Sequence, residues 1–418
     1  MTFKNFLELE KKTSSGLYLD NLTGIRALAV LWVLILHTWA ITGSGSVNFN
    51  IPFTAHEIGV ARVIRMGEWG VDIFFVLSGF LLTTPFLRAR KNVPFIEGTL
   101  DFYRRRALRL LPAYYFAILA LIYFLLYGLG KLPTPAEMLQ HVLLANTWFE
   151  TPPLRGAFWS LPVEALFYVF LPFLIFAASR CKSFHTVFIF LIFLTIALRF
   201  IVINTPTIQS KGIFLFSFFG RMDQFSLGAI AAYFCIKHPA SPRKGSIILM
   251  TSIIGMLIFI SFIGRRGNLF ENRDHFYYFF QTIVGIISAA MIYGAASHSK
   301  IARLLFGNRV MIFVGTISYS IYLWHTIILD IFVMTNLPHG LTPDNKLVAT
   351  ILYTWPPILI ASFLSYLFIE RPFLKVRHEP ENNSASFISR RPIIFLSLSA
   401  IALVALTYAS QAIYQINH

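Results

Sequence analysis

The sequence predicts an all-α protein that crosses a membrane many times. Of its 418 residues, 56% are hydrophobic and only 13% are charged, and the mean hydropathy is +0.66. A soluble domain usually carries about twice that charged fraction. So much apolar surface exceeds what one or two globular cores can bury, and the composition therefore excludes soluble, disordered and fibrous chains.

Eleven apolar segments are long enough to cross a bilayer as helices, because a membrane-spanning helix needs about 20 mostly apolar residues. The first segment is not a cleaved signal peptide, since it is too long and contains Arg26 and His37. The approximate ranges are 21–42, 70–87, 112–129, 158–178, 185–203, 212–235, 246–264, 275–295, 311–334, 347–369 and 392–414.

The chain divides into four segments on this pattern. A cytoplasmic segment, 1–20, precedes a core of ten transmembrane helices, 21–373. A polar cytoplasmic linker, 374–391, then leads to an additional C-terminal helix within 392–418.

Basic residues orient the chain with its N-terminus inside and its C-terminus outside. With eleven spans, 23 of the 35 Lys and Arg residues lie on the side of the N-terminus and nine on the opposite side. Cytoplasmic loops carry this excess in membrane proteins. The net charge of +16 therefore reflects topology, and we expect no nucleic-acid partner. The two cysteines, Cys181 and Cys235, have no metal-ligand spacing, and no metal is expected.

Charged side chains inside a membrane are costly and are default candidates for function. Arg26 and His37 are 11 residues apart in the first span, so both face one way and lie about 16 Å apart along the helix axis. An interfacial anchor and a core histidine would also explain them. Glu164 lies at a depth similar to His37, where a carboxylate could orient a histidine base. A structural ion pair of Glu164 with Arg221 or Arg26 is the alternative.

Two further groups of polar residues stand out. Ser318, Tyr322 and His325 share one helix face and favour a polar cavity, although interhelical hydrogen bonds would explain them too. Arg221 and Asp223 are two residues apart, so they face different directions and should not pair with each other.

An arginine cluster ends the loop after the second span. Arg105, Arg106 and Arg109 precede Pro112, which we take as the start of a helix. Arginines suit phosphate recognition. Ordinary positive-inside topology or contact with anionic lipid headgroups would also explain the cluster.

Seven segments, in order along residues 18–373, resemble the membrane acyltransferase family 3, the integral-membrane O-acyltransferases of bacterial envelope sugars and their relatives. They are GIRALAVLWVLILHTW with its Arg-x10-His pattern, GVDIFFVLSGFLL, RRRALRLLPAYYF, FWSLPVEALFYVFLP, FGRMDQFSLG, FVGTISYSIYLWH and FIERPF.

The resemblance implies a multi-pass enzyme of the bacterial plasma membrane. Such an enzyme moves an acyl group, usually acetyl, from cytoplasmic acyl-CoA to a hydroxyl of an acceptor on the other side. The acceptor is expected to be an envelope glycan such as O-antigen, an exopolysaccharide or a lipid-linked sugar. Some relatives carry an extracytoplasmic SGNH hydrolase-like domain. Because this chain ends at His418, we expect a second transfer step either to need a separate extracytoplasmic transferase or not to occur.

The resemblance also assigns expected roles to residues. His37 matches the essential histidine, and Arg26 matches the arginine of the same motif. The coenzyme A phosphates are expected near the arginines, and we favour His37 as a direct base over His37 as an acyl carrier. The full assignment is catalytic His37, Glu164, Arg26, His325 and Asp223; acyl-CoA-binding Arg105, Arg106, Arg109 and Arg26; and acceptor-binding Asp72, Trp159, Ser318 and Tyr322.

A proton-coupled transporter or flippase of a glycan or lipid intermediate is the alternative function, because intramembrane charges also mark proton relays and substrate paths. No inverted-repeat symmetry in the sequence supports it.

Overall fold

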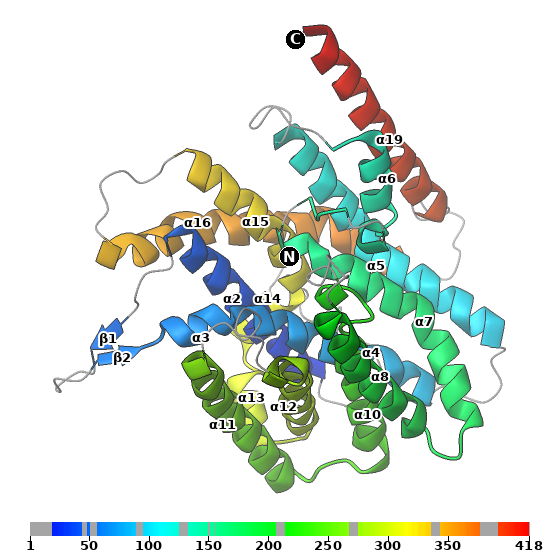
Figure 1. Ribbon diagram of the computed structural model, residues 1–418, viewed down its shortest axis with the longest axis vertical. Helices are drawn as coiled ribbons and strands as arrows, with labels where there is room; N and C mark the ends of the chain where they lie inside the picture. The colour runs from blue at the N-terminus through cyan, green and yellow to red at the C-terminus, as the bar shows by residue number, and fades with distance from the viewer. Residues whose placement is uncertain are drawn as a thin grey trace.

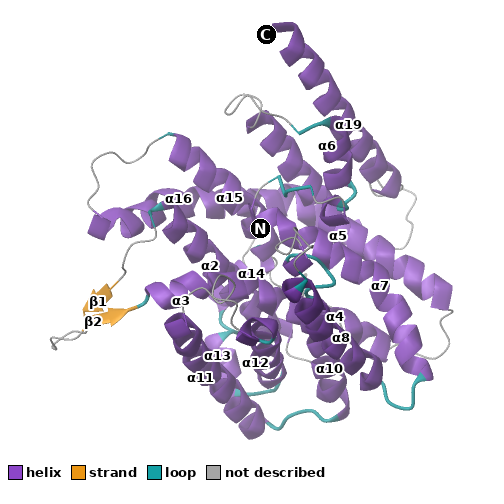
Figure 2. Cartoon of the chain, viewed as in Figure 1, coloured by secondary structure: helices purple, strands orange, loops and turns teal. Residues whose placement is uncertain are grey.

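The protein is a bundle of membrane helices with a short β-hairpin at one edge (Figures 1 and 2). The hairpin consists of β1 (Asn48–Asn50) and β2 (Glu57–Gly59), which pair antiparallel. This computed structural model describes residues 19–43, 48–50, 57–88, 95–124, 133–148, 151–154, 156–205, 214–266, 275–335, 343–376 and 392–417. The predicted all-α polytopic fold is confirmed.

Each predicted span overlaps a helix or a helix pair of the described chain. Seven helices of the described chain are long and apolar enough to cross a membrane, or eight if one bent pair counts as a span. The predicted count of eleven and the N-in orientation stay predictions. The helices are α2 (Leu19–Ile41), α4 (Trp69–Arg88), α5 (Phe95–Phe124), α7 (Ser160–Arg180), α8 (His185–Asn204), α10 (Met222–Lys237), α11 (Pro242–Arg266), α12 (Phe280–Ala295), α14 (Arg309–Thr316) with α15 (Ser318–Met334), α16 (Pro343–Ser365) and α19 (Pro392–Asn417).

Shorter elements connect these helices. The remaining ones are α3 (Ala61–Arg65), η1 (Met66–Glu68), α6 (Pro135–Val142), η3 (Asn146–Trp148), η4 (Gly156–Trp159), η5 (His275–Tyr278), α13 (Lys300–Leu305), a π-helical turn (Tyr366–Glu370) and α17 (Arg371–Val376). Residues 1–18 of the predicted N-terminal segment 1–20 lie outside the described residues, as does most of the linker 374–391.

Helix α5 corrects the predicted start of the third span. It begins at Phe95, so Arg105, Arg106 and Arg109 lie within a helix and Pro112 lies in its interior. The first half of α5 is rich in good helix formers, and an ion pair between Asp101 and Arg105, one turn apart, supports it. A search for apolar runs does not detect such a charged half-helix. The arginines therefore project from a rigid helix instead of a loop.

The ninth predicted span is broken. Its two halves, α14 and α15, are bent by 67° at Ile317. This break sets the direction of α15, so that Ser318, Tyr322 and His325 point into the bundle and are buried.

Close packing of α4 against α10 forms the centre of the bundle. Gly79 of α4 lies against the carbonyl oxygen of Phe225, and Gly228 of α10 lies against the carbonyl oxygen of Val76. Small residues allow membrane helices to approach this closely. Beside the glycines, the Phe225 ring stacks on the Phe167 ring of α7 with centroids 4.3 Å apart. This contact joins α7 to the central pair.

Helix α19 packs against α5 and α6 and projects beyond the rest of the bundle (Figure 1). Helix α6 itself is held by α5, since the Tyr114 hydroxyl donates to the carbonyl oxygen of His141 and the Tyr115 hydroxyl to that of Val142. Burial lowers the pKa of His141 to about 4, so this side chain is neutral at physiological pH.

We expect Gly228→Ala to destabilise the protein by about 1–3 kcal/mol, because its methyl group would overlap the Val76 carbonyl and force α10 away from α4. Gly255→Ala on α11 is the matched control, since a Cβ there meets open space within the described structure. Thermal unfolding in detergent measures both. Equal melting temperatures for the two variants would contradict the proposed packing constraint.

Candidate active site

Two cavities adjoin in the middle of the bundle, and Val71 and Tyr322 line both of them. The arginine cavity measures about 130 Å³, and the histidine cavity about 770 Å³. Polar residues of the arginine cavity are Arg26, Ser78, Arg106, Arg109, Ser160, Glu164, Tyr168, Ser318 and Tyr319. Those of the histidine cavity are His37, Glu68, Asp72, Asn146, Thr147, Thr151, Trp159, Arg221 and Gln281.

The arginine cavity collects three of the four predicted acyl-CoA-binding residues. Arg26, Arg106 and Arg109 all line it. The guanidinium of Arg106 lies 5.7 Å from the centre of the Phe102 ring, and its buried Nε has no hydrogen-bond partner among the described residues. Arg105 pairs with Asp101 outside the cavity, with about a third of its side chain exposed.

Glu370 is a residue that sequence reasoning missed. It lies in the π-helical turn, is only 1% exposed, and accepts a hydrogen bond from the Ser320 hydroxyl. Its Oε2 lies 3.9 Å from Nη1 of Arg109. The available signal was an acidic residue directly before Arg371 at the end of an apolar span. It is the acidic residue of the segment FIERPF.

Glu164 lies in the arginine cavity and not beside His37. It accepts a hydrogen bond from the Ser78 hydroxyl at 2.5 Å. Within the described structure it forms no hydrogen bond to His37 and no ion pair with Arg221, which binds Asp72 instead. Equal depth in the membrane therefore did not mean contact.

His325 occupies the place that we expected for Glu164. Its Nδ1 lies 3.0 Å from the carbonyl oxygen of Ile321, and a carbonyl can only accept, so Nδ1 carries the proton. Its Nε2 is then an acceptor, 3.3 Å from Nδ1 of His37. Nδ1 of His37 also lies 3.0 Å from the carbonyl oxygen of Val33, which makes it the donor. Nε2 of His37 is therefore the unprotonated nitrogen.

Two of the three residues in the predicted polar stripe on α15 line the cavities, and the third contacts His37. Ser318 lines the arginine cavity, Tyr322 lines both cavities, and His325 contacts His37. The Tyr322 hydroxyl donates to the carbonyl oxygen of Ala157 at 2.6 Å and accepts from the Ser160 hydroxyl at 2.7 Å. These bonds hold the Tyr322 ring as part of the wall between the two cavities.

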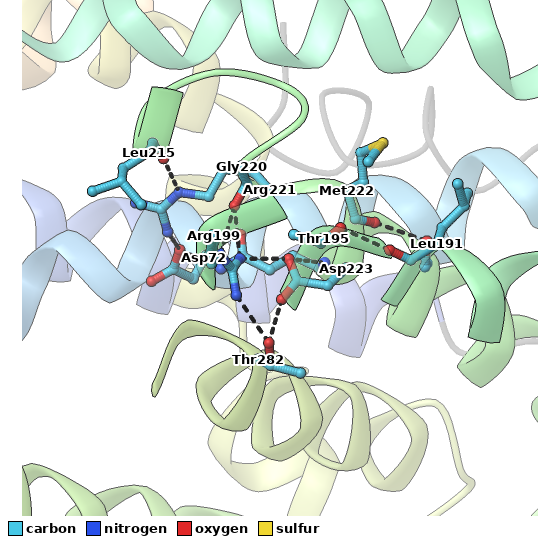
Figure 3. A network of polar contacts seen from close by, with 12 residues as sticks. Asp72, Leu191, Thr195, Arg199, Leu215, Gly220, Arg221, Met222, Asp223 and Thr282 are labelled. Carbon is cyan, nitrogen blue, oxygen red and sulfur yellow. Dashed lines mark hydrogen bonds and ion pairs between the residues drawn. The ribbon is translucent and has the colours of Figure 1, made fainter. Parts of the chain in front are cut away.

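A network of buried charges lies beside the histidine cavity, and only its Asp72 and Arg221 half lines that cavity. Figure 3 shows the network. Nη1 of Arg221 lies 2.6 Å from Oδ1 of Asp72, which also accepts from Gln224 Nε2 at 2.7 Å. The Arg221 guanidinium lies 5.4 Å from the centre of the Trp159 ring. Asp72 and Trp159, both predicted to bind the acceptor, therefore line the cavity that contains His37.

Asp223 lies in the second half of that network, away from His37. Its Oδ1 is 2.8 Å from Nη2 of Arg199, and its Oδ2 accepts from the Thr282 hydroxyl at 2.5 Å. Arg199 and Asp223 are both 0% exposed, and neither lines the two cavities. As predicted, Arg221 and Asp223 do not pair with each other, because each binds a different partner (Figure 3).

The acyltransferase domain family matches residues 19–370, which is most of the chain. The protein belongs to the membrane acyltransferase family 3. The O-acetyltransferase OatA of Staphylococcus aureus strain NCTC 8325 / PS 47 is 28% identical over 403 residues, covering 90% of this chain and 60% of the relative. OatA of S. aureus strain MRSA252 gives the same identity and coverage. The chain thus spans about 60% of the length of these curated relatives. No solved structure gives a significant match.

We expect Asp223→Ala to lower the stability of this acyltransferase by about 3–5 kcal/mol, because it leaves the Arg199 charge buried without its carboxylate. The double variant Arg199→Met/Asp223→Leu removes both charges and should recover most of the loss. Thermal unfolding in detergent measures the effect. A double variant no more stable than Asp223→Ala would contradict a pairing role.

Proposed function

We propose that this acyltransferase is an O-acetyltransferase of the bacterial plasma membrane. It transfers an acetyl group from cytoplasmic acetyl-CoA to a hydroxyl of an envelope glycan or its lipid-linked precursor. The proposal rests on one observation: a cavity lined by three arginines adjoins a larger cavity that contains a histidine with a free Nε2. The names of the S. aureus relatives support acetyl as the group transferred.

The arginine cavity suits the donor. Arg26, Arg106 and Arg109 present donors to phosphate oxygens, and the Nε of Arg106 has no acceptor among the described residues. At about 130 Å³ the cavity is too small for the whole nucleotide, so it would hold the phosphate groups beside the arginines, where the narrow pantetheine arm begins. Acetyl-CoA supplies an activated thioester carbonyl to the reaction.

The histidine cavity suits the acceptor. Its volume lies within the range of about 300–1,000 Å³ that is usual for ligand sites. Nε2 of His37 takes the proton of the acceptor hydroxyl as the oxygen attacks the carbonyl. The resulting imidazolium donates from Nδ1 to Nε2 of His325, which stabilises its charge and fixes the ring. His37 then returns the proton to the departing sulfur.

The transporter or flippase alternative is disfavoured by the family match, which is to an acyltransferase domain. Among the enzymatic routes, an acyl group carried on His37 would use the same Nε2 as a nucleophile. Direct base catalysis requires no such intermediate. Labelled acetyl on His37 after incubation with the donor alone would overturn our preference.

We expect His37→Ala to lower acetyl transfer at least about 100-fold, because the reaction loses its general base. His325→Ala should lower kcat less, since the base remains but loses its orienting partner. The assay uses purified protein in proteoliposomes, [¹⁴C]acetyl-CoA and de-O-acetylated envelope glycan from the source cells. His238→Ala, an exposed histidine, is the control. Transfer by His37→Ala at the wild-type rate would refute the mechanism.

We expect Arg106→Ala to raise the KM for acetyl-CoA about tenfold or more, because a charged hydrogen bond to the donor contributes about 1.5–3 kcal/mol. Arg105→Ala should have a smaller effect, since Arg105 pairs with Asp101 outside the cavity. Arg180→Ala, at the exposed end of α7, is the control. The same assay at varied acetyl-CoA concentrations measures this. Equal effects in the Arg105 and Arg106 variants would indicate general surface charge instead of a binding site.

A further inference from the structure

We propose that Asn146 and Gln281 form an acceptor-positioning subsite in the histidine cavity. Their amide oxygens accept hydrogen bonds from two hydroxyl groups of the acceptor that do not react. The inference rests on the proposed function, and it adds two residues to which the sequence drew no attention.

Both side chains carry buried oxygens without partners. Asn146 is 2% exposed and Gln281 is 3% exposed, and both line the cavity that contains His37. Asn146 Oδ1 and Gln281 Oε1 have no hydrogen-bond partner among the described residues, and neither does Thr147 Oγ1 in the same cavity. Buried polar atoms are nearly always hydrogen-bonded, because an unpaired one costs about 1–3 kcal/mol. Several such atoms in one cavity indicate a binding site.

The local backbone holds Asn146 in place. Leu144 has a φ of 54°, a left-handed conformation that turns the chain sharply after α6. The amide nitrogen of Thr151 then donates to the carbonyl oxygen of Asn146 at 3.0 Å, which closes a small loop. The side-chain Nδ2 of Asn146 faces the carbonyl oxygen of Thr151 at 3.4 Å. Since a carbonyl only accepts, this contact engages Nδ2 and leaves Oδ1 as the side-chain atom without a partner among the described residues.

The chemistry of these atoms defines the ligand. An amide oxygen accepts and cannot donate, so the bound group must present O–H or N–H donors. Glu68 and Asp72 add carboxylate acceptors to the same cavity, while the cation of Arg221 is already engaged by Asp72. A neutral polyhydroxyl ring fits this set, whereas a carboxylate or phosphate does not.

An aromatic wall completes the subsite. The rings of Trp159 and Phe216 lie 4.8 Å apart, and both line the cavity. They offer an apolar surface to the C–H face of a sugar ring, while Asn146 and Gln281 would bind hydroxyls at its edge. The reacting hydroxyl would then face His37. The subsite therefore positions the acceptor and takes no part in proton transfer.

A structural role for Gln281 and a role in ligand binding predict opposite changes in stability. Gln281→Met keeps the length of the side chain but removes the unpaired oxygen. If Gln281 serves the ligand, this variant should melt at or above the wild-type temperature and yet bind the acceptor less well. If Gln281 serves the fold, the variant should melt at a lower temperature. Thermal unfolding of the full chain in detergent distinguishes the two.

The deciding experiment measures the KM for de-O-acetylated envelope glycan in the proteoliposome transfer assay. Asn146→Ala and Gln281→Met should each raise it about five- to tenfold, the effect of one lost hydrogen bond. The kcat should stay within about twofold, and the KM for acetyl-CoA should not change. Asn146→Asp keeps an acceptor oxygen, so its KM for the glycan should be closer to the wild-type value than that of Asn146→Ala. Asn204→Ala, on α8 outside the cavity, is the control.

The outcomes separate the two proposals. Wild-type protein that transfers no acetyl group refutes the proposed function, and the subsite with it. Normal wild-type transfer with an unchanged glycan KM in both variants refutes only the subsite. A raised KM for acetyl-CoA, or a lower melting temperature in Gln281→Met, also refutes it, because either result indicates a structural disturbance.

Discussion

The pairing of charges at membrane depth is the constraint on which the rest of this structure depends. Arg199 and Arg221 reach across from α8 and from the start of α10, and each binds a carboxylate, Asp223 and Asp72 respectively. They also donate to the backbone. Arg199 binds the carbonyl oxygen of Gly220 through Nε and Nη2, and Arg221 binds that of Leu215 through Nε. Non-helical backbone inside a membrane is tolerated only where its polar groups are satisfied. The two arginines satisfy the turn before α10, and that turn supplies Leu215 and Phe216 to the histidine cavity.

The break between α14 and α15 serves the site in a similar way. A straight helix over 311–334 would carry Ser318, Tyr322 and His325 along one axis, but the 67° bend redirects the whole stripe at its first residue. His325 then reaches His37 while Tyr322 separates the two cavities. One helix face therefore supplies Ser318 to the arginine cavity, Tyr322 to both cavities and His325 as the partner of His37.

The sequence predicted what hydropathy and periodicity can encode. Apolar runs located the helices, because lipid requires about 20 apolar residues in a row. The i, i+4, i+7 spacing correctly placed the α15 stripe on one face. The contact partners of the polar side chains were harder to predict, because depth along a helix axis does not determine which neighbour a side chain faces. For that reason Glu164 was assigned to His37, whose partner is His325. Uncharged polar residues such as Asn146 and Gln281 are passed over by a search for charged side chains inside the membrane.

Charge balance explains why the arginine cavity also contains carboxylates. Arg26, Arg106 and Arg109 share a cavity of about 130 Å³, where three unscreened cations would repel one another strongly. Glu164 lines the same cavity, and Glu370 lies 3.9 Å from Arg109. Two carboxylates beside three guanidinium groups leave one net positive charge. That balance lowers the cost of keeping the arginines buried, and it still favours an anionic ligand over a neutral one. Glu164 is therefore as much a part of the arginine cavity as the arginines are, and Glu370 supports that cavity through Arg109.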